Sequence, residues 1–136
     1  MNYKSEFKNK KIIITGHTGF KGSWLTAILI SYGAKVIGIS DNKIKNSHIK
    51  HLKLKNKIKD LKVDIRNEKK IISIFEKVQP DYVFHLAAQS LVPKSVLKPS
   101  ETWTTNVLGT FNVMNALRFK KKGKCAGIII TSDKCY

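Results

Sequence analysis

Residues 11–22, KIIITGHTGFKG, decide the fold of this chain. A branched apolar run leads directly into three glycines spaced three apart, Gly16, Gly19 and Gly22, and a helical pattern follows over residues 20–32. A strand that enters a glycine turn and then a helix is typical of a dinucleotide-binding unit. We interpret Gly16 as turning the chain, Gly19 as admitting a pyrophosphate and Gly22 as allowing close packing of the helix. The alternative is an ordinary strand–loop–helix connection, because the spacing differs from the common G-x-G-x-x-G.

Strand and helix patterns alternate along the whole chain. This alternation predicts an α/β fold, a Rossmann-like doubly wound parallel sheet of order 3-2-1-4-5 in one domain over residues 1–136. We expect the chain to be truncated after the fifth strand, which leaves that strand at an edge. The predicted strands are 11–15, 35–39, 61–64, 82–86 and 126–131, the first, fourth and fifth of them buried on both faces. The predicted helices are 20–32, 68–78 and 100–120, with a short helix within 42–59 and a loop containing Pro93 and Pro99. The expected inward face of the last helix is Trp103, Val107, Phe111, Met114 and Leu117.

Composition excludes several classes of protein. The net charge is +17, but only Arg66 and Arg118 among the 26 basic residues are arginines, and the lysines are spread over the chain. Specific nucleic-acid readers rely on arginine, so we expect no specific nucleic-acid partner. No apolar run is long enough for a membrane span. Cys125 and Cys135 are interpreted as reduced thiols of a cytoplasmic protein, and no metal-ligand spacing occurs.

Two acidic residues follow predicted strands where a dinucleotide would lie. Asp41 comes 19 residues after Gly22, the distance at which an acid binds the adenosine ribose 2′-OH and favours NAD over NADP. The alternative is a turn residue. Asp64 can accept from the adenine amino group while Ile65 packs on the ring; the alternative is an N-cap or turn aspartate.

Small and polar residues follow the fourth and fifth strands. The small residues after His85 admit a ligand or permit tight packing, and His85 itself is interpreted as a packed, hydrogen-bonded histidine. We interpret Asn106 as a side chain that hydrogen-bonds to backbone groups or supports a ligand. The alternative is a solvated position. Residues 131–134 combine a hydroxyl, an acid and an amine, or form a polar turn. The expected cofactor-binding residues are Thr15, Gly16, Thr18, Gly19, Phe20, Gly22, Asp41, Asp64, Ile65, Leu86, Ala87, Ala88, Gln89, Asn106 and Thr131.

Four segments, 15–25, 85–89, 105–110 and 131–136, together resemble the extended short-chain dehydrogenase/reductase family of nucleotide-sugar enzymes. Within it, the chain is most similar to the CDP-glucose 4,6-dehydratase branch. The runs Gly-His-Thr-Gly-Phe-Lys-Gly-Ser-Trp and Ser-Asp-Lys-Cys-Tyr carry this resemblance. Related dehydratases have Asp-Glu where this chain has Asp133-Lys134.

The resemblance implies an NAD-dependent lyase of polysaccharide biosynthesis. Such an enzyme takes hydride from C4 of CDP-glucose, loses water from C6 and returns the hydride to C6, giving CDP-4-keto-6-deoxyglucose. By position, the expected catalytic residues are Asp133 as the acid at the C6 hydroxyl, Lys134 at C5 and Ser132 at the C4 oxygen. The resemblance also implies that the full-length protein forms a homodimer.

The chain departs from the family pattern in three ways. No tyrosine is followed by lysine at the fourth position, whereas the family uses a Tyr-x-x-x-Lys pair. The C-terminal substrate domain is expected to be absent, so we expect the chain alone to be inactive. Pro93 stands where the family usually has arginine. The alternatives are another nucleotide-sugar epimerase or reductase of the family, or a non-catalytic NAD-binding fragment.

Overall fold

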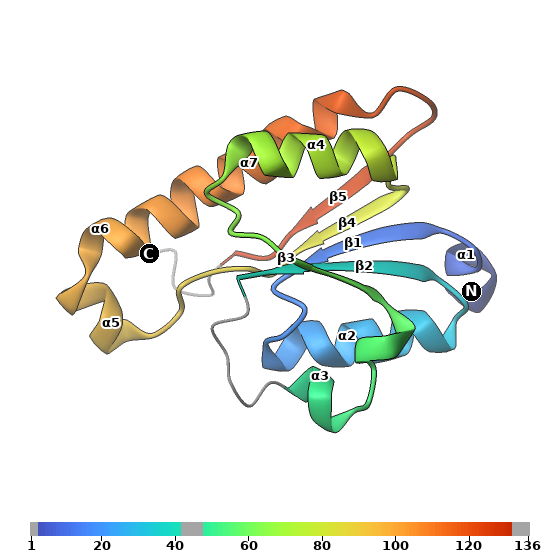
Figure 1. The fold of residues 1–136 in the computed structure, drawn as a ribbon, viewed down its shortest axis with the longest axis horizontal. Coiled ribbons are helices and arrows are strands. Elements are labelled where there is room, and N and C mark those ends of the chain that lie inside the picture. Colours follow the sequence, from blue (N-terminus) through green and yellow to red (C-terminus); the bar gives the residue numbers. More distant parts are fainter. Residues whose placement is uncertain (1–2, 42–47, 132–136) are drawn as a thin grey trace.

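A computed structural model describes residues 3–41 and 48–131, which contain a five-stranded parallel sheet (Figure 1). The strand order is β3-β2-β1-β4-β5, which confirms the predicted doubly wound topology. β1 lies at the centre, so connections leave it toward both edges of the sheet. The strands are β1 Lys11–Thr15, β2 Lys35–Ser40, β3 Lys59–Lys62, β4 Tyr82–His85 and β5 Ala126–Ile129.

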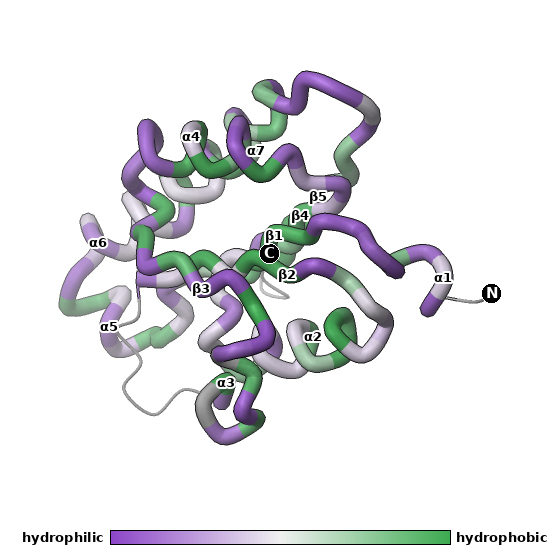
Figure 2. The backbone as a smooth tube through the Cα atoms, turned by 45° about the vertical axis from the view of Figure 1, so that its right-hand side comes forward, coloured by the Kyte–Doolittle hydropathy of each residue, from purple (hydrophilic) through white to green (hydrophobic). Residues whose placement is uncertain are grey.

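Helices cover both faces of the sheet. Figures 1 and 2 show α2 and α3 on one face and α4 and α7 on the other, as expected when each parallel strand is followed by a crossover helix. α4 spans the predicted 68–78 and ends at Gln79, which adopts a left-handed conformation. The helices are α1 Tyr3–Phe7, α2 Phe20–Ser31, α3 His48–His51, α4 Glu68–Val78, α5 Val92–Leu97, α6 Pro99–Trp103 and α7 Gly109–Ala116, with short 3-10 turns at Lys55–Lys57 and Leu117–Phe119 and a π turn at Thr104–Leu108.

The core has two halves, one on each side of the sheet. Ile13 of β1 packs with α4 and α7, whereas its neighbours Ile12 and Ile14 pack with Leu29 of α2. Because successive side chains of a strand point to opposite faces, a strand buried on both faces must be apolar at every position. The apolar run of β1 therefore reflects its central place in the sheet.

The register aligns the carboxyl ends of the central strands. Thr15 at the end of β1 is opposite Ile39 of β2 and His85 of β4. Connections from β1 and β4 lead to opposite sides, so ligands of such sheets bind beyond these ends. The glycine turn that follows Thr15 lies at this point.

Several predicted boundaries are wrong. β3 runs over 59–62 rather than 61–64, so Asp64 lies in the turn after the strand. β5 is an edge strand with exposed and half-buried residues, not one buried on both faces. The loop with Pro93 and Pro99 instead contains α5 and α6, with a proline in the first turn of each, where its missing N–H costs no hydrogen bond.

The inward face predicted for residues 100–120 is also wrong. Trp103, Phe111 and Met114 are 67%, 59% and 52% exposed. The buried residues of α7 are instead Gly109, Asn112, Val113 and Ala116. A Cβ on Gly109 would lie 2.5 Å from Cδ1 of Ile65, so the small face of the helix is the one that can approach the core. Of the predicted face, Leu117 packs against the core.

No helix among the described residues combines the length and apolar character needed to cross a bilayer.

Candidate functional site

The glycine turn after β1 is shaped by backbone contacts with β2 and β4. Gly16 has a φ of +74°, and a Cβ there would lie 2.7 Å from the backbone nitrogen of Ala87. Its own N–H donates to Ile39 O at 2.8 Å. Gly16 is therefore required twice, by its left-handed conformation and by the close passage of the chain after β4.

Gly22 and Gly19 differ in what they contact. A Cβ on Gly22 would collide with the carbonyl oxygen of Gly16, so α2 packs against the turn itself. At Gly19 a Cβ would meet only Gly16 O, at 3.3 Å. Gly19 is the N-cap of α2 and offers no side chain to the free amides of the first turn. These amides form a ready site for an anion, and Gly19 leaves the approach to them open.

Buried side-chain hydrogen bonds connect the ends of β1 and β4 to α7. His85 Nδ1 lies 2.6 Å from Thr15 Oγ1, and His85 Nε2 lies 2.9 Å from Thr110 Oγ1. The N–H of Ala87 donates to Thr15 Oγ1 at 3.3 Å. Burial lowers the pKa of His85 to about 4, so its ring is neutral at pH 7. His85 is thus the packed histidine that its sequence context indicates, and the hydroxyl of Thr15 is occupied by protein contacts.

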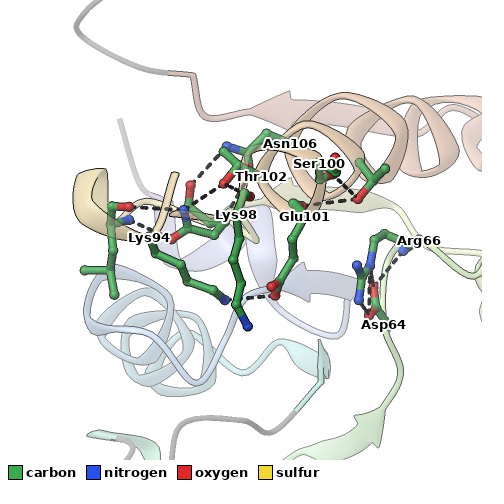
Figure 3. A network of polar contacts seen from close by, with 11 residues as sticks. Asp64, Arg66, Lys94, Lys98, Ser100, Glu101, Thr102 and Asn106 are labelled. Carbon is green, nitrogen blue, oxygen red and sulfur yellow. Dashed lines mark hydrogen bonds and ion pairs between the residues drawn. The ribbon is translucent and has the colours of Figure 1, made fainter. Parts of the chain in front are cut away.

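Asn106 fixes the chain that follows β4. Gln89 N donates to Asn106 Oδ1 at 2.8 Å, and Asn106 Nδ2 donates to Gln89 O at 3.0 Å. Gln89 Nε2 also donates to Thr102 Oγ1 at 3.1 Å (Figure 3). Asn106 lies in the π turn 104–108, a distortion often found at functional sites. It satisfies backbone groups, one of the roles foreseen, and holds residues 86–89 against the glycine turn.

The turn after β3 presents an aspartate held by an arginine. Arg66 Nη2 donates to Asp64 Oδ2 at 2.6 Å, and Arg66 N donates to Asp64 Oδ1 at 2.9 Å (Figure 3). Asp64 is therefore a turn residue, while Asn67 caps α4 through a bond from Lys70 N. Ile65 is 4% exposed and belongs to the core.

The acidic groups meet at the same edge of the sheet. The pKa of the Arg66 guanidinium is raised, mainly by its hydrogen bond with Asp64 and further by the negative charges of Asp64, Glu101 and Asp41. Asp41 lies half-buried just after β2. An open pocket of about 600 Å³ adjoins this cluster. Its lining residues are Asp64, Arg66, Asn67, Glu68 and Lys69.

His17 is a residue of the turn whose placement the sequence analysis missed. Its ring is fully buried, and a Cβ on Gly38 would lie 2.5 Å from it. Nε2 lies 3.1 Å from Asp60 Oδ1, but without hydrogen-bond geometry. Burial lowers the pKa of His17 against the opposing effect of Asp60. The available signal was Gly38, because glycine inside a strand often marks a close approach.

The remaining candidate residues lie in different surroundings. Thr18 is buried, Phe20 is exposed with its ring 5.2 Å from that of His48, and Leu86 packs in the core on the α2 side. Thr131 is exposed, at the end of the described residues. Ser132, Asp133 and Lys134 lie outside the described residues, so their catalytic roles stay predictions. Within 3–41 and 48–131, no group of three His, Cys, Asp or Glu residues could hold a metal ion.

A second pocket, of about 420 Å³, lies at the other end of the sheet. It is formed where β1 begins and the chain enters β4, around Lys11, Gln79 and Asp81. None of the candidate cofactor-binding residues lines it, so we assign the ligand site to the carboxyl ends.

Together, these elements can hold a long, anionic ligand across the sheet edge. Free amides of α2 face the turn at Gly16–Gly19, and carboxylates stand about the ends of β2 and β3. Amides suit a pyrophosphate, and carboxylates suit the hydroxyl and amino groups of a nucleoside.

Comparisons with known proteins match this chain to nucleotide-sugar dehydratases and epimerases. The model of the family described as GDP-mannose 4,6 dehydratase matches residues 13–136. A CDP-glucose 4,6-dehydratase of Salmonella typhimurium is 38% identical over 98% of this chain and 37% of its own length. A GDP-mannose 4,6-dehydratase of Vibrio cholerae is 33% identical over 82% of this chain and 32% of its own length.

Solved structures show the same fold. The epimerase Mth375 of Methanothermobacter thermautotrophicus has a TM-score of 0.83 at 27% identity, covering 98% of this chain and 38% of that one. A Thermus thermophilus UDP-glucose 4-epimerase in complex with NAD has a TM-score of 0.73 at 26% identity, covering 85% and 36%. The chain thus spans less than two fifths of each of these relatives.

Proposed function

The chain belongs to the family described as GDP-mannose 4,6 dehydratase, a family of nucleotide-sugar dehydratases and epimerases, and from this premise we propose that it is the NAD-binding part of a CDP-glucose 4,6-dehydratase. The observation that carries the proposal is the glycine turn between β1 and α2. Each of its glycines answers a separate need of a dinucleotide site: a left-handed turn, an open approach and a closely packed helix.

The residues present fit NAD. The uncapped amides of α2 would bind its pyrophosphate, Asp41 the adenosine ribose and Asp64 the adenine, while Ile65, whose side chain is buried in the core, would support the turn that carries Asp64. The Thermus thermophilus relative has NAD bound, and an enzyme of Bordetella bronchiseptica with 28% identity has NAD+ bound. Bound NAD would supply reversible hydride acceptance. The chain would contribute its orientation, with residues 86–89 closing on the turn and Thr131 and Thr18 completing the lining.

CDP-glucose is the proposed substrate and CDP-4-keto-6-deoxyglucose the proposed product. The Salmonella typhimurium relative supports this choice, since its 38% identity extends over 98% of the chain. The proposed roles are protonation of the departing C6 hydroxyl by Asp133, help at C5 by Lys134 and a hydrogen bond to the C4 oxygen from Ser132. The setting would be cytoplasmic, in polysaccharide biosynthesis.

Turnover would need more than these residues. The sequence contains no Tyr-x-x-x-Lys pair, which the resemblance assigns to the C4 hydroxyl. We therefore expect the chain by itself to bind NAD without dehydratase activity. Two alternatives remain in the proposal: a non-catalytic NAD-binding fragment, or part of a nucleotide-sugar epimerase, which the structural likeness to a UDP-glucose 4-epimerase favours.

The complete protein would be a homodimer. Its contact would use the exposed apolar side of α6, the π turn and α7, where Trp103, Phe111 and Met114 lie. An apolar helix face of this kind is typical of a protein interface.

A chimera tests the substrate. The chain would replace the matching 37% of the Salmonella typhimurium relative, and loss of water from CDP-glucose, GDP-mannose and UDP-glucose would be followed by mass spectrometry. We expect dehydration of CDP-glucose, lost in a chimera with Asp133→Asn and retained with the control Asp81→Asn. A chimera that binds NAD but dehydrates no sugar contradicts the dehydratase assignment. Dehydration of CDP-glucose by the chain alone contradicts its expected inactivity.

A further inference from the structure

The His17 side chain connects the glycine turn to the sheet. The backbone of His17 lies between Gly16 and Gly19, and the Gly19 N–H donates to Gly16 O at 3.0 Å, which closes the turn. The turn leads into the free amides of α2, yet the imidazole of His17 is fully buried. Contacts that fix this ring in the core therefore also restrain the backbone of the turn.

The space for the ring comes from Gly38 of β2. A Cβ on Gly38 would lie 2.5 Å from Cγ and Cδ2 of His17 and 2.7 Å from Nδ1, so the ring lies directly on the strand. Residues two apart in a strand share a face, so Gly38 faces the same side as Val36, which packs with Leu29 of α2. The backbone of Gly38 is not left-handed, so its missing side chain serves the ring alone.

Asp60 of β3 and the first turn of α2 confine His17 from two further directions. Asp60 is paired with Gly38 in the parallel register, and its Oδ1 lies 3.1 Å from Nε2 of the ring. A Cβ on Gly22 would lie 2.9 Å from Cα of His17, so α2 closes over the backbone of this residue. Burial lowers the pKa of His17 although Asp60 and Ile39 act to raise it, so the ring is neutral at pH 7 and is held mainly by shape.

We propose that His17 is a positioning residue of the phosphate-binding turn: its ring, seated on Gly38, fixes the backbone of residues 16–19 beside the free amides of α2. The inference rests on the proposed binding of NAD with its pyrophosphate at this turn. An amide donates well to a phosphate oxygen only when its N–H is aimed at that oxygen, so a small displacement of the turn weakens the bond. His17 acts through the backbone, because its buried ring does not reach the ligand.

A double-mutant cycle tests the ring against the space that it occupies. NAD is titrated calorimetrically into the wild type, His17→Ala, Gly38→Ala and the double variant. We expect each single variant to bind NAD about tenfold more weakly, the effect of losing one hydrogen bond to a charged group. Gly38→Ala acts by displacing the ring, so in the His17→Ala background it should change the affinity by less than about twofold, a coupling expected of residues in contact.

Two controls separate positioning from a general loss of stability. Leu29→Ala removes a buried side chain from the same half of the core, and Gly127→Ala crowds a strand glycine whose Cβ would lie 2.9 Å from Cδ1 of Leu117. Both should keep the wild-type affinity for NAD, although Leu29→Ala should lower the free energy of unfolding measured in urea. Circular dichroism would establish that each variant is folded. If His17→Ala does not fold, Gly38→Ala compared with Gly127→Ala decides.

The results that would overturn the inference are separable. If His17→Ala and Gly38→Ala are less stable than the wild type but bind NAD equally well, the ring only fills the core and the positioning role is wrong. If Gly38→Ala weakens binding equally with and without the ring, Gly38 acts independently of His17 and the inference is also wrong. If the wild type does not bind NAD, the proposed function itself is wrong.

Discussion

At the scale of single residues, the glycine turn contains two kinds of requirement. Gly22 faces the backbone of Gly16, so its missing side chain serves the fold. Gly19 faces open space apart from Gly16 O, so its missing side chain serves a ligand. Stability and cofactor affinity should therefore respond differently to alanine at these two positions.

Gly22→Ala should destabilise the chain by about 2 kcal/mol, a usual cost of overpacking. Gly19→Ala should change the free energy of unfolding by less than about 1 kcal/mol and yet weaken NAD binding by about tenfold or more, because its Cβ enters the pyrophosphate approach. Urea unfolding and calorimetric NAD titration measure the two effects. Equal losses of stability in both variants would contradict this division of roles.

His85 should make stability depend on pH. The unfolded chain protonates this histidine near 6.5, whereas the buried ring has a pKa of about 4. The unfolded state therefore binds more protons as the pH falls through this window, and unfolding becomes easier by up to about 3 kcal/mol. His17, whose pKa is also lowered, acts in the same direction.

Urea unfolding of the wild type and of His85→Gln at pH 7.5 and pH 5 measures the contribution of His85 to the pH dependence of stability. The variant should lose less stability than the wild type between the two pH values, and His48→Gln, an exposed control, should match the wild type. A His85→Gln variant with the wild-type pH dependence would show that burial of this ring is not the cause.

At the scale of elements, the π turn 104–108 links the last helical run to the site. It contains Asn106, whose side chain holds both backbone groups of Gln89. The helix thus positions a loop from the neighbouring strand, and the loop in turn closes on Gly16 through Ala87.

Asn106→Ala should release this loop. The Gln89 amide loses its acceptor, so its hydrogen exchange should accelerate by about tenfold or more, as for an opened local structure. Asn106→Asp should have a smaller effect because it keeps an acceptor, and Asn115→Ala on α7 is the control. Unchanged protection of Gln89 in Asn106→Ala would mean that other contacts hold the loop.

Elements with local signals could be predicted to the residue. β1 is a continuous apolar run that ends at a glycine, and α4 has a capping Asn67 and a break before Pro80. The face of α7 could not be predicted, because it depends on Ile65 lying over Gly109, 44 positions along the chain by their numbers. α5 and α6 were missed because Pro93 and Pro99, one in the first turn of each helix, were interpreted as loop residues.

The candidate site is likewise predictable only in part, because its contacts join distant parts of the sequence. The positions of Gly16, Asp64 and Asn106 follow from motif and spacing, but their partners do not. Nothing near Gly16 in the sequence indicates that it meets Ala87, and Gly38 indicates a close approach without identifying His17 as the side chain that lies there. These contacts join segments that become neighbours only when the sheet forms.

At the scale of the whole molecule, one apolar side of the helical run faces outward. Trp103, Phe111 and Met114 are more than half exposed. The proposed dimer would cover them, which explains why a surface helix carries such large apolar side chains.

Phe111→Asp should therefore reduce self-association while changing the stability of the monomer by less than about 0.5 kcal/mol, as for exposed positions. Sedimentation over a range of concentrations measures the association, and Lys122→Ala, which lowers the net charge by one as Phe111→Asp does, is the control at an exposed site. Unfolding of Phe111→Asp would contradict the exposed placement of this ring, and unchanged association would exclude it from the contact.

The most direct test of a dinucleotide site at the glycine turn is a calorimetric titration of NAD into the wild type, Gly19→Val and the control Ala126→Val, an exposed position at the start of β5. We expect saturable one-to-one binding by the wild type and the control, and none by Gly19→Val in a folded protein. Wild-type binding that persists in Gly19→Val, or no binding by the wild type, would contradict a dinucleotide site at the glycine turn.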